Sequence, residues 1–493
     1  MRGSVDTPRD VKSTAVRSTG WVVLEKWVGR TITMVVFVIL GRVLAPEDFG
    51  VIALANVFVA VLTALIEQGF SRTVVQRARL SPVDIDTAFW TALGFAAVVY
   101  AALFFGAPLI ASAYDEPQLT WLIRALGLSV VIMAGSSVPA ALLERSFAFR
   151  ALAVRQLSGN IAGGALAVGV AILGGGAWAL VAQLLGTAVV ASAVLWVRSD
   201  WRPRMAFSLA SLKDMWAFGA TALAGELILA VGRQTDNFVI GTFFGSTALG
   251  YYFMALRIVN IVAELVTGVF GKVSFTTFSR LQHDSAKVER AFRMVTLGTA
   301  LSSLPVFAFL ACAAPDLLTV VMGEKWADSG VILTILATGM AIGIVARYDR
   351  GVLLALNKPG PGFRMTFTRQ GMGILLLFAA VPFGVGAVPW ARSARQVLFW
   401  PMRFYSLKKH AGIAWPTYVK PFARVALPVA LAAGATFAVR LMLGDMAALT
   451  RLLLLGVVFA ASLAVLMLIL ARPLLREAVG VLNSTRKGPK PRD

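Results

Sequence analysis

The sequence predicts an all-α polytopic membrane protein with about fourteen transmembrane helices in two related halves. Three observations support this fold class: the apolar composition, a series of long apolar segments, and a sequence frame that occurs twice. Of the 493 residues, 58% are hydrophobic and only 14% are charged. Because soluble domains average about half apolar and about a quarter charged residues, the composition alone indicates a protein that lies in a membrane.

The apolar segments have the length of bilayer-crossing helices, which need about 20 mostly apolar residues. About fourteen segments meet this requirement: 21–44, 50–70, 88–112, 119–141, 151–173, 176–197, 215–240, 248–271, 292–321, 328–347, 365–387, 388–407, 422–443 and 449–471. The weakest of them is 388–407, because it carries Arg392, Arg395 and Arg403.

A repeated frame, F-R-x-x-x-x-R-Q-x-x-G, indicates that the two halves are related. It occurs at residues 149–159 and again at 363–373, each time after the fourth long apolar segment of its half. The same register is supported by the glycines that bracket the first turn of each half: Gly41 with Gly50, and Gly241 with Gly250. Duplication of this kind is typical of membrane transporters.

Lysine and arginine are concentrated in alternate loops and in both tails, and the formal net charge is +21. The intervening loops are almost free of basic residues, as at 174–176, 241–247 and 384–389. Since an excess of Lys and Arg marks cytoplasmic loops, we expect both termini to lie in the cytoplasm. Membrane orientation accounts for the basic charge, so we expect no nucleic-acid partner.

The first predicted helix carries Glu25, Lys26 and Arg30 in its first half. Ionisable groups at a helix centre cost roughly 2.5–3.5 kcal/mol each on insertion scales, so they usually face a cavity or a partner. The cations Lys26 and Arg30 lie one turn apart on the same face, beside Glu25. Two interpretations stay open: Glu25 neutralises the cations, or they bind a phosphate group of a ligand.

The opening helix pair of each half carries a polar stripe, since spacings of three, four and seven residues place side chains on one helix face. The stripe residues are Asn56, Thr63 and Glu67 in the first half, and Glu226, Arg233, Asp236, Arg257, Asn260 and Glu264 in the second. Two such pairs facing each other would enclose a wet, charged cavity between the halves. The alternative is a set of ion pairs that only hold the halves together.

Each copy of the repeated frame supplies two arginines at the expected cytoplasmic surface: Arg150 with Arg155, and Arg364 with Arg369. One interpretation is anchoring of the cytoplasmic side through contact with anionic lipid. The other is capture of a phosphorylated lipid headgroup as it enters the protein.

Motifs for catalysis and metal binding are absent from the sequence. It has no G-x-x-x-x-G-K-[ST] phosphate loop, no G-x-S-x-G nucleophile elbow and no zinc-ligand spacing. The single cysteine, Cys312, lies in an apolar run, and His283 and His410 are far apart. We therefore expect no enzymatic activity, no catalytic residue, no metal site and no organic cofactor.

Four stretches carry a resemblance to a known family. They are G-R at 29–30, the hairpin G-R-V-L-A-P-E-D-F-G at 41–50, A-L-L-E-R followed by F-R at 141–150, and L-G-Y-Y at 249–252. Together they resemble the Wzx-like lipid-linked oligosaccharide flippases, the polysaccharide transport family of the multidrug/oligosaccharidyl-lipid/polysaccharide exporter superfamily. The resemblance extends over nearly the whole chain, and the hairpin is its most specific part, here with Gly41 where the family pattern has Ala.

The resemblance implies two pseudo-symmetric six-helix bundles around a central cavity, plus two extra C-terminal helices. It implies a flippase that works by alternating access in the bacterial inner membrane. Its substrate would be an undecaprenyl-pyrophosphate-linked oligosaccharide repeat unit, moved from the cytoplasmic to the periplasmic leaflet for capsule, O-antigen or exopolysaccharide biosynthesis. A polysaccharide polymerase and glycosyltransferases would be its partners.

The resemblance also implies that cavity cations contact the pyrophosphate. By matching position this role falls to Arg30, whereas Arg233 and Arg257 are added from their helical phase, and Lys26 departs from the family pattern. The remaining polar residues expected in the cavity are Glu67, Glu226, Asp236, Asn260 and Glu264. The acidic ones could balance the arginines of the empty cavity, or bind H⁺ or Na⁺ as coupling ions, and both alternatives stay open.

The expected domains follow from these assignments. They are a cytoplasmic N-terminal tail (1–20), the N-terminal six-helix bundle (21–198), a cytoplasmic linker (199–214), the C-terminal six-helix bundle (215–407), a cytoplasmic loop (408–421), two extra transmembrane helices (422–472) and a basic cytoplasmic tail (473–493).

Three other functions remain as alternatives. An ion-coupled multidrug or small-molecule antiporter of the same superfamily would be expected to have an acid-dominated cavity, whereas this one is rich in arginine. A membrane polymerase of glycan repeats would be expected to carry a long external catalytic loop. A non-transporting scaffold would leave the cavity charges dispensable.

Overall fold

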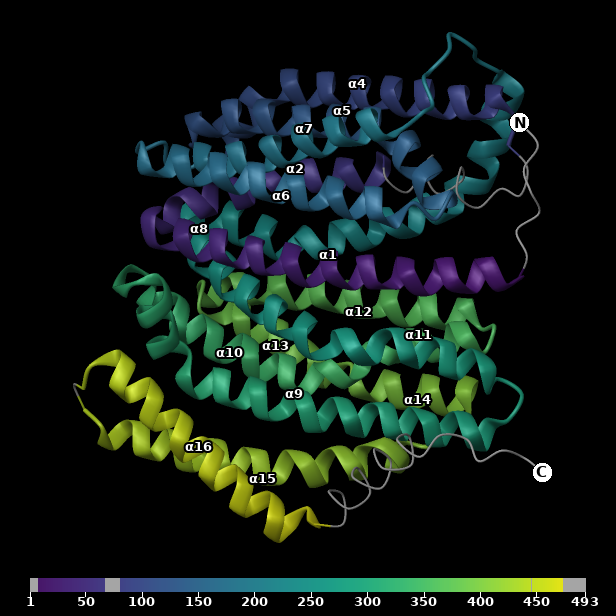
Figure 1. Ribbon diagram of the computed structural model, residues 1–493. Coiled ribbons are helices and arrows are strands. Elements are labelled where there is room, and N and C mark those ends of the chain that lie inside the picture. Colours follow the sequence, from purple (N-terminus) through teal and green to yellow (C-terminus); the bar gives the residue numbers. More distant parts are fainter. Residues whose placement is uncertain (1–7, 67–79, 445, 473–493) are drawn as a thin grey trace. The chain divides into compact units, whose positions relative to one another are not determined.

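The computed structural model describes residues 8–66, 80–444 and 446–472 (Figure 1), and within these ranges it describes all side chains except those of 8–24, 65–66, 214–226, 269–273 and 275–276. All regular elements of the described ranges are helices, which confirms the predicted all-α class. The chain divides into two compact units, Met1–Gly250 and Tyr251–Asp493.

The first unit is a helical bundle, in which helices pack against their neighbours in the chain and against helices further away in the sequence. Its helices are α1 (Pro8–Val43), α2 (Pro46–Ile66), α4 (Pro82–Ala113), α5 (Pro117–Arg145), α6 (Phe149–Ile172), α7 (Trp178–Arg198) and the first arm of α8 (Leu209–Arg280). Helix α6 packs between α1 and α7, and α5 packs against α2, α4 and α7.

The second unit contains the second arm of α8 and the remaining helices. These are α9 (Ser285–Met322), η2 (Glu324–Trp326), α10 (Ala327–Gly343), η3 (Ile344–Tyr348), α11 (Asp349–Ala355), α12 (Pro359–Ala380), η4 (Val381–Phe383), α13 (Ala387–Leu398), α14 (Trp400–Ala411), α15 (Trp415–Met442) and α16 (Ala448–Leu470). Helix α8 bends at Gly245, whose φ of 82° and ψ of 178° lie outside the helical region. The two arms on either side of this bend contain the predicted segments 215–240 and 248–271.

Within the described residues, ten helices are long and apolar enough to cross a membrane. The protein is therefore a multi-pass membrane protein, while the number of fourteen spans stays a prediction. The weakest predicted segment, 388–407, does not form one long helix but lies in two helices of 12 residues each, α13 and α14. The limits of the predicted domains also stay predictions, although α8 already begins at Leu209, inside the expected linker 199–214.

Helix starts follow ordinary capping chemistry. Helix α4 begins with a capping box, in which the backbone N–H of Asp84 donates to Ser81 Oγ (3.2 Å) and that of Ser81 donates to Asp84 Oδ2 (2.9 Å). Helix α2 begins at Pro46, which lacks the N–H that would go unpaired in a first turn. The backbone N–H of Ala45 donates to Asp48 Oδ2 (2.9 Å), so the P-E-D part of the hairpin motif encodes this helix start.

The segment between α7 and α8 is attached to the start of α4. The indole N–H of Trp90 donates to the Arg204 carbonyl (2.8 Å), and the backbone N–H of Arg204 donates to buried Asp86 (3.2 Å). The Ser211 hydroxyl donates to Asp84 Oδ1 (2.6 Å). These bonds hold the beginning of α8 against the first unit.

The glycine of the repeated frame lies against the following helix in both units. A Cβ atom on Gly159 in α6 would lie 2.9 Å from the Thr187 carbonyl oxygen in α7. A Cβ atom on Gly373 in α12 would lie 2.8 Å from Arg395 Cδ in α13. The frame therefore marks a close helix contact in each unit, with backbone at Gly159 and with the flexible Arg395 side chain at Gly373.

The hairpin glycines Gly50 and Gly250 meet each other inside the first unit. A Cβ atom on Gly50 would overlap the carbonyl group of Ser246, and a Cβ atom on Gly250 would overlap that of Pro46. The contact is reciprocal, because each glycine faces the residue four positions before the other. The two first turns of the repeat therefore pack backbone against backbone, as expected of a duplicated structure.

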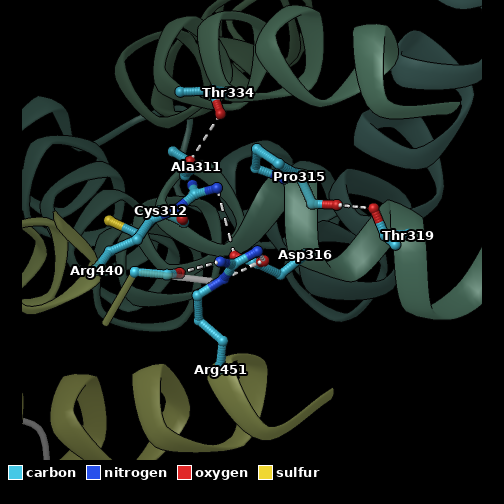
Figure 2. Close-up of polar contacts among 9 residues, drawn as sticks. Ala311, Cys312, Pro315, Asp316, Thr319, Thr334, Arg440 and Arg451 are labelled. Atoms are coloured by element: carbon cyan, nitrogen blue, oxygen red, sulfur yellow. Dashed lines mark hydrogen bonds and ion pairs between the residues drawn. The ribbon is translucent and has the colours of Figure 1, made fainter. Parts of the chain in front are cut away.

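In the second unit, one buried carboxylate joins the C-terminal hairpin to α9 (Figure 2). Asp316 is 1% exposed and lies in an apolar part of α9. Arg451 of α16 donates from Nε to Asp316 Oδ1 (2.6 Å), and Arg440 Nη2 of α15 lies 3.4 Å from Oδ2. Arg440 also donates to the Cys312 carbonyl (2.8 Å), and Arg451 to the Gly444 carbonyl (2.8 Å). Helices α15 and α16, which pack against each other and against α9, are thus attached by paired charges (Figure 1).

We predict that Asp316→Ala destabilises the protein by about 3–5 kcal/mol, because removing one partner leaves uncompensated cations in an apolar setting. The melting temperature of the purified protein in detergent measures this effect. Asp328→Ala is the matched control, since Asp328 is exposed at the start of α10. Equal melting temperatures for the two variants would contradict the structural role of Asp316.

We predict that Gly50→Ala disrupts packing of the first unit, since the new methyl group would overlap the Ser246 carbonyl. The expected results are a lower yield of folded protein and a lower melting temperature. Gly106→Ala provides the control, because a Cβ atom on Gly106 in α4 meets nothing within 4 Å. That change should leave stability equal or raise it by about 0.5–1 kcal/mol, and a Gly50 variant that behaved like it would refute the predicted clash.

Candidate functional site

The cations of α1 lie beside a helix crossing in the first unit. A Cβ atom on Gly29 would lie 3.2 Å from Asn160 Nδ2 of α6, which shows how closely the two helices approach. Arg30, the next residue, is half-buried, whereas Lys26 is exposed. Arg30 therefore lies next to the crossing of α1 and α6, and Lys26 lies one helical turn before Arg30.

The first copy of the basic frame lies on the helix that packs against α1. Arg150 is exposed at the start of α6, and Arg155 is half-buried further along the helix. Gln156 donates from Nε2 to Asn160 Oδ1 (3.0 Å), and Asn160 is the residue that faces Gly29. The structure thus brings the predicted substrate residue Arg30 and the predicted capture residue Arg155 onto neighbouring helices of one unit.

The polar stripe of α8 is divided between the two units. In the first unit Arg233 is exposed and Asp236 is buried. In the second unit Arg257 and Glu264 are exposed and Asn260 is half-buried. The shared cavity that these residues would line, and the roles assigned to them, stay predictions. Glu67 and the side chain of Glu226 lie outside the described residues.

The second copy of the basic frame has one arginine outside and one inside the second unit. Arg364 is exposed near the start of α12. Arg369 is half-buried, donates from Nη2 to Gln396 Oε1 of α13 (3.1 Å), and lies 6.0 Å from the ring centre of Phe399. Its guanidinium group therefore points into the bundle, toward α13.

Sequence reasoning undervalued the arginines of α13 and α14. The sequence analysis used these arginines, Arg392, Arg395 and Arg403, only as evidence that 388–407 is a weak membrane span. In the structure Arg395 and Arg403 are buried, with 7% and 0% of their surface exposed. Arg403 donates from Nε to Asp349 Oδ2 (2.7 Å), and Asp349 is itself buried. The signal that could have found them is the charge itself, because an arginine kept inside an apolar segment usually has a function.

Comparison with known proteins supports a role in polysaccharide biosynthesis. Residues 39–331 match the family described as polysaccharide biosynthesis protein. The succinoglycan biosynthesis transport protein ExoT of Rhizobium meliloti (strain 1021) is 30% identical over 68% of this chain and 68% of its own. The teichuronic acid biosynthesis protein TuaB of Bacillus subtilis (strain 168) is 25% identical over 82% of this chain and 85% of its own. The lipopolysaccharide biosynthesis protein WzxC of Escherichia coli (strain K12) is 25% identical over 59% of this chain and 60% of its own.

Solved structures with a similar fold are transporters. The lipid II flippase MurJ in an inward closed conformation aligns with a TM-score of 0.75 at 12% identity, covering 92% of this chain and 99% of that one. An inward-facing multidrug resistance MATE transporter of the MOP superfamily aligns with a TM-score of 0.59 at 15% identity, covering 83% of this chain and 98% of that one. At such identities the likeness concerns the fold. By its sequence and its fold together, the chain belongs to the polysaccharide biosynthesis protein family and has the architecture of the MOP exporters.

Proposed function

We propose that this protein is a flippase that moves undecaprenyl-pyrophosphate-linked oligosaccharide repeat units from the cytoplasmic to the periplasmic leaflet of a bacterial inner membrane. The observation that carries the proposal is membership of the polysaccharide biosynthesis family in a chain with the fold of membrane transporters. Three relatives are named for succinoglycan, teichuronic acid and lipopolysaccharide. Because these polymers differ, the feature such proteins would share is the lipid carrier and its diphosphate, rather than one glycan.

The physical problem of such a transporter is the headgroup charge. A diphosphate bears about two negative charges. Because the cytoplasm is electrically negative, the membrane potential favours outward movement of these charges by roughly 2.3 kcal/mol per charge per 100 mV. The free-energy barrier to transport arises because the phosphates lose their bound water inside the membrane. Guanidinium groups lower this barrier, because their N–H donors replace the lost water. Arg30 is suited to this task, since it is half-buried on α1 and follows Gly29, where α1 approaches α6 closely.

In this proposal the protein acts between two enzymatic steps without catalysing either. Glycosyltransferases would complete the lipid-linked unit in the cytoplasm, and a polymerase would consume it after translocation. Both termini would lie in the cytoplasm, as the distribution of Lys and Arg predicts. The arginines held inside the second unit favour an anionic substrate over the organic cations of a multidrug antiporter.

The proposal predicts that Arg30→Ala abolishes polymer export while membrane insertion stays normal. The test is complementation of a strain from which this gene has been deleted, with polymer on the cell surface as the measurement and protein in the membrane fraction as the check on insertion. Arg30→Lys should retain part of the export, because it keeps the charge but loses the bidentate donor geometry.

Arg198→Ala is the control for this experiment, because Arg198 is an exposed arginine at the end of α7 in the same unit. It should support normal export. Full export from the Arg30→Ala variant at equal protein level would remove Arg30 from the site.

A second prediction separates the flippase from an antiporter of the same fold. Cells that overproduce the protein should accumulate the same amount of an organic cation, such as ethidium, as cells that lack the protein. Reduced accumulation that depends on a proton or sodium gradient would favour the antiporter instead.

A further inference from the structure

Five arginines and one aspartate of the second unit form a chain of neighbouring charges that runs from a buried end to an exposed one. We call them the arginine cluster: Arg347 of η3, Arg369 of α12, Arg392 and Arg395 of α13, and Arg403 of α14, with Asp349 of α11. The predicted substrate residues Arg30, Arg233 and Arg257 lie on other helices. The cluster therefore calls for its own explanation.

The deep end of the cluster is a buried ion pair. Arg403 donates from Nε to Asp349 Oδ2 (2.7 Å) and from Nη2 to the Val345 carbonyl (3.3 Å). Its guanidinium group lies 4.5 Å from the ring centre of Tyr418 and 5.3 Å from that of Trp400. Arg403 is thus fixed by protein contacts, and Asp349 is already engaged by it.

The middle of the cluster combines Arg369 and Arg395. Arg395 packs against the backbone of Gly373, and the Gln396 amide packs against Gly343 of α10. Arg369 donates to that amide, and the charges acting on Arg369 are those of Arg395, Asp349, Arg347 and Arg403. Among these four groups only Asp349 is negative.

The outer end of the cluster is Arg347. It is exposed at the surface of the unit and donates from Nη1 to Thr267 Oγ1 of α8 (2.8 Å). Exposure therefore rises along the cluster, from Arg403 at 0% and Arg395 at 7% to half-buried Arg369 and exposed Arg347. The guanidinium group of Arg347 is therefore the part of the cluster that an anion in water would meet first.

Two interrupted helices build the cluster. The five-residue 3₁₀ segment η3 separates α10 from α11, and Phe399 separates α13 from α14, whose second residue is Pro401. Broken helices at membrane depth commonly surround ligand sites in transporters, because the freed backbone groups line a polar space. The cluster lies where these two interruptions meet, since α11 packs against α14 and α10 against α13.

The described groups around Arg369 carry more positive than negative charge. The charges acting on it are those of Arg395, Arg347, Arg403 and a single carboxylate, Asp349, which already pairs with Arg403. Three buried polar atoms of the cluster have no hydrogen-bond partner: the donors Nε of Arg395 and Nη1 of Arg403, and the acceptor Oδ1 of Asp349. Oδ1 of Asp349 belongs to the pair with Arg403, so the orphan that calls for a missing acceptor is Nε of Arg395, because buried donors are almost always paired.

The corresponding helix of the first unit carries no such arginines. Helix α7 follows the turn 174–176 as α13 follows the turn 384–386, yet α7 has no Lys or Arg before its last residue, Arg198. The first unit thus builds this helix without internal arginines, so the arginines of α13 call for an explanation other than helix packing.

We propose that the arginine cluster is a binding site for a phosphate-bearing anion of the diphosphate class. Guanidinium groups are planar and present paired N–H donors, which match phosphate oxygens in bidentate contacts. Arg347, Arg369 and Arg395 would contact the anion, and Arg403 would position the floor of the site through Asp349. The natural source is either a lipid-linked diphosphate, which rests on the flippase function proposed above, or a free phosphate compound.

Binding of inorganic pyrophosphate to the full chain in phosphatidylcholine nanodiscs tests this site by isothermal titration calorimetry. Arg369→Gln should weaken binding about tenfold or more, as expected when one charged bidentate contact is lost. Arg369→Lys should weaken it less. Arg424→Gln is the control, because Arg424 is an exposed arginine of α15 in the same unit, and it should bind as the unchanged protein does.

Melting temperatures of all variants are measured beside the titrations, so that misfolding is not mistaken for lost binding. A second, buried position extends the test: Arg395→Lys keeps the charge, and it should weaken pyrophosphate binding if Arg395 contacts the anion. Pyrophosphate affinity that is equal in the Arg369→Gln and Arg424→Gln proteins, or absent from the unchanged protein, would overturn the proposal.

The two sources of the anion are distinguished by adding a polyprenyl diphosphate to the nanodiscs. Competition with pyrophosphate in the unchanged protein and in Arg424→Gln assigns the site to a lipid headgroup, and absence of competition assigns it to a free phosphate compound. The site and the transport function fail independently. If Arg30→Ala cells export normally while pyrophosphate binding still depends on Arg369, only the role of Arg30 is rejected. If Arg30→Ala cells lose export but pyrophosphate binding does not depend on Arg369, the arginine cluster is rejected as the binding site.

Discussion

The cost of placing a charged group inside an apolar bundle governs this structure. Such a group needs a counter-charge, a dense set of hydrogen bonds, or contact with water or a ligand. Asp316 meets the requirement with Arg440 and Arg451, and this pairing attaches the C-terminal hairpin to α9. Asp349 meets it with Arg403. These carboxylates account for Arg440, Arg451 and Arg403. The other arginines held inside the second unit, Arg369 and Arg395, are the candidates for function.

A second constraint is the close approach of backbones. Helices in a membrane gain no hydrophobic free energy from packing against each other, so close van der Waals contact and small residues hold them together. Gly159 and Gly373 each lie against the following helix of their unit, and Gly50 meets Gly250 between the two first turns of the repeat. The duplication seen in the sequence thus corresponds to repeated contacts of the same kind.

The sequence was a good guide to the fold because composition and segment length report directly on the membrane. Residues such as Gly50 and Gly373 could be singled out by repetition, since a repeated glycine marks a repeated contact. The interruption of the predicted span 388–407 was harder to foresee, because the same arginines that weaken its apolar character are buried by its neighbours.

The site could be predicted only in part. The position of Arg30 follows from a motif. The contacts of Gly29 with Asn160 and of Asp316 with Arg451, however, join residues more than a hundred positions apart, which no spacing rule reveals. Arg369 was recognised as half of a repeated frame and assigned to the surface near Arg364, yet its hydrogen bond to Gln396 directs it into the second unit. Helical phase gives the face of a residue, whereas its partner depends on how distant helices pack.

The central claim is that this fold carries an anionic lipid headgroup across the membrane. The most direct measurement reconstitutes the purified protein in liposomes with an oligosaccharide linked to polyprenyl diphosphate, and follows which leaflet holds the sugar by its access to an added glycosidase. The account predicts that sugar protected in the inner leaflet becomes accessible when the protein is present, and more slowly with the Arg30→Ala variant. Equal protection in liposomes with and without the unchanged protein would contradict it.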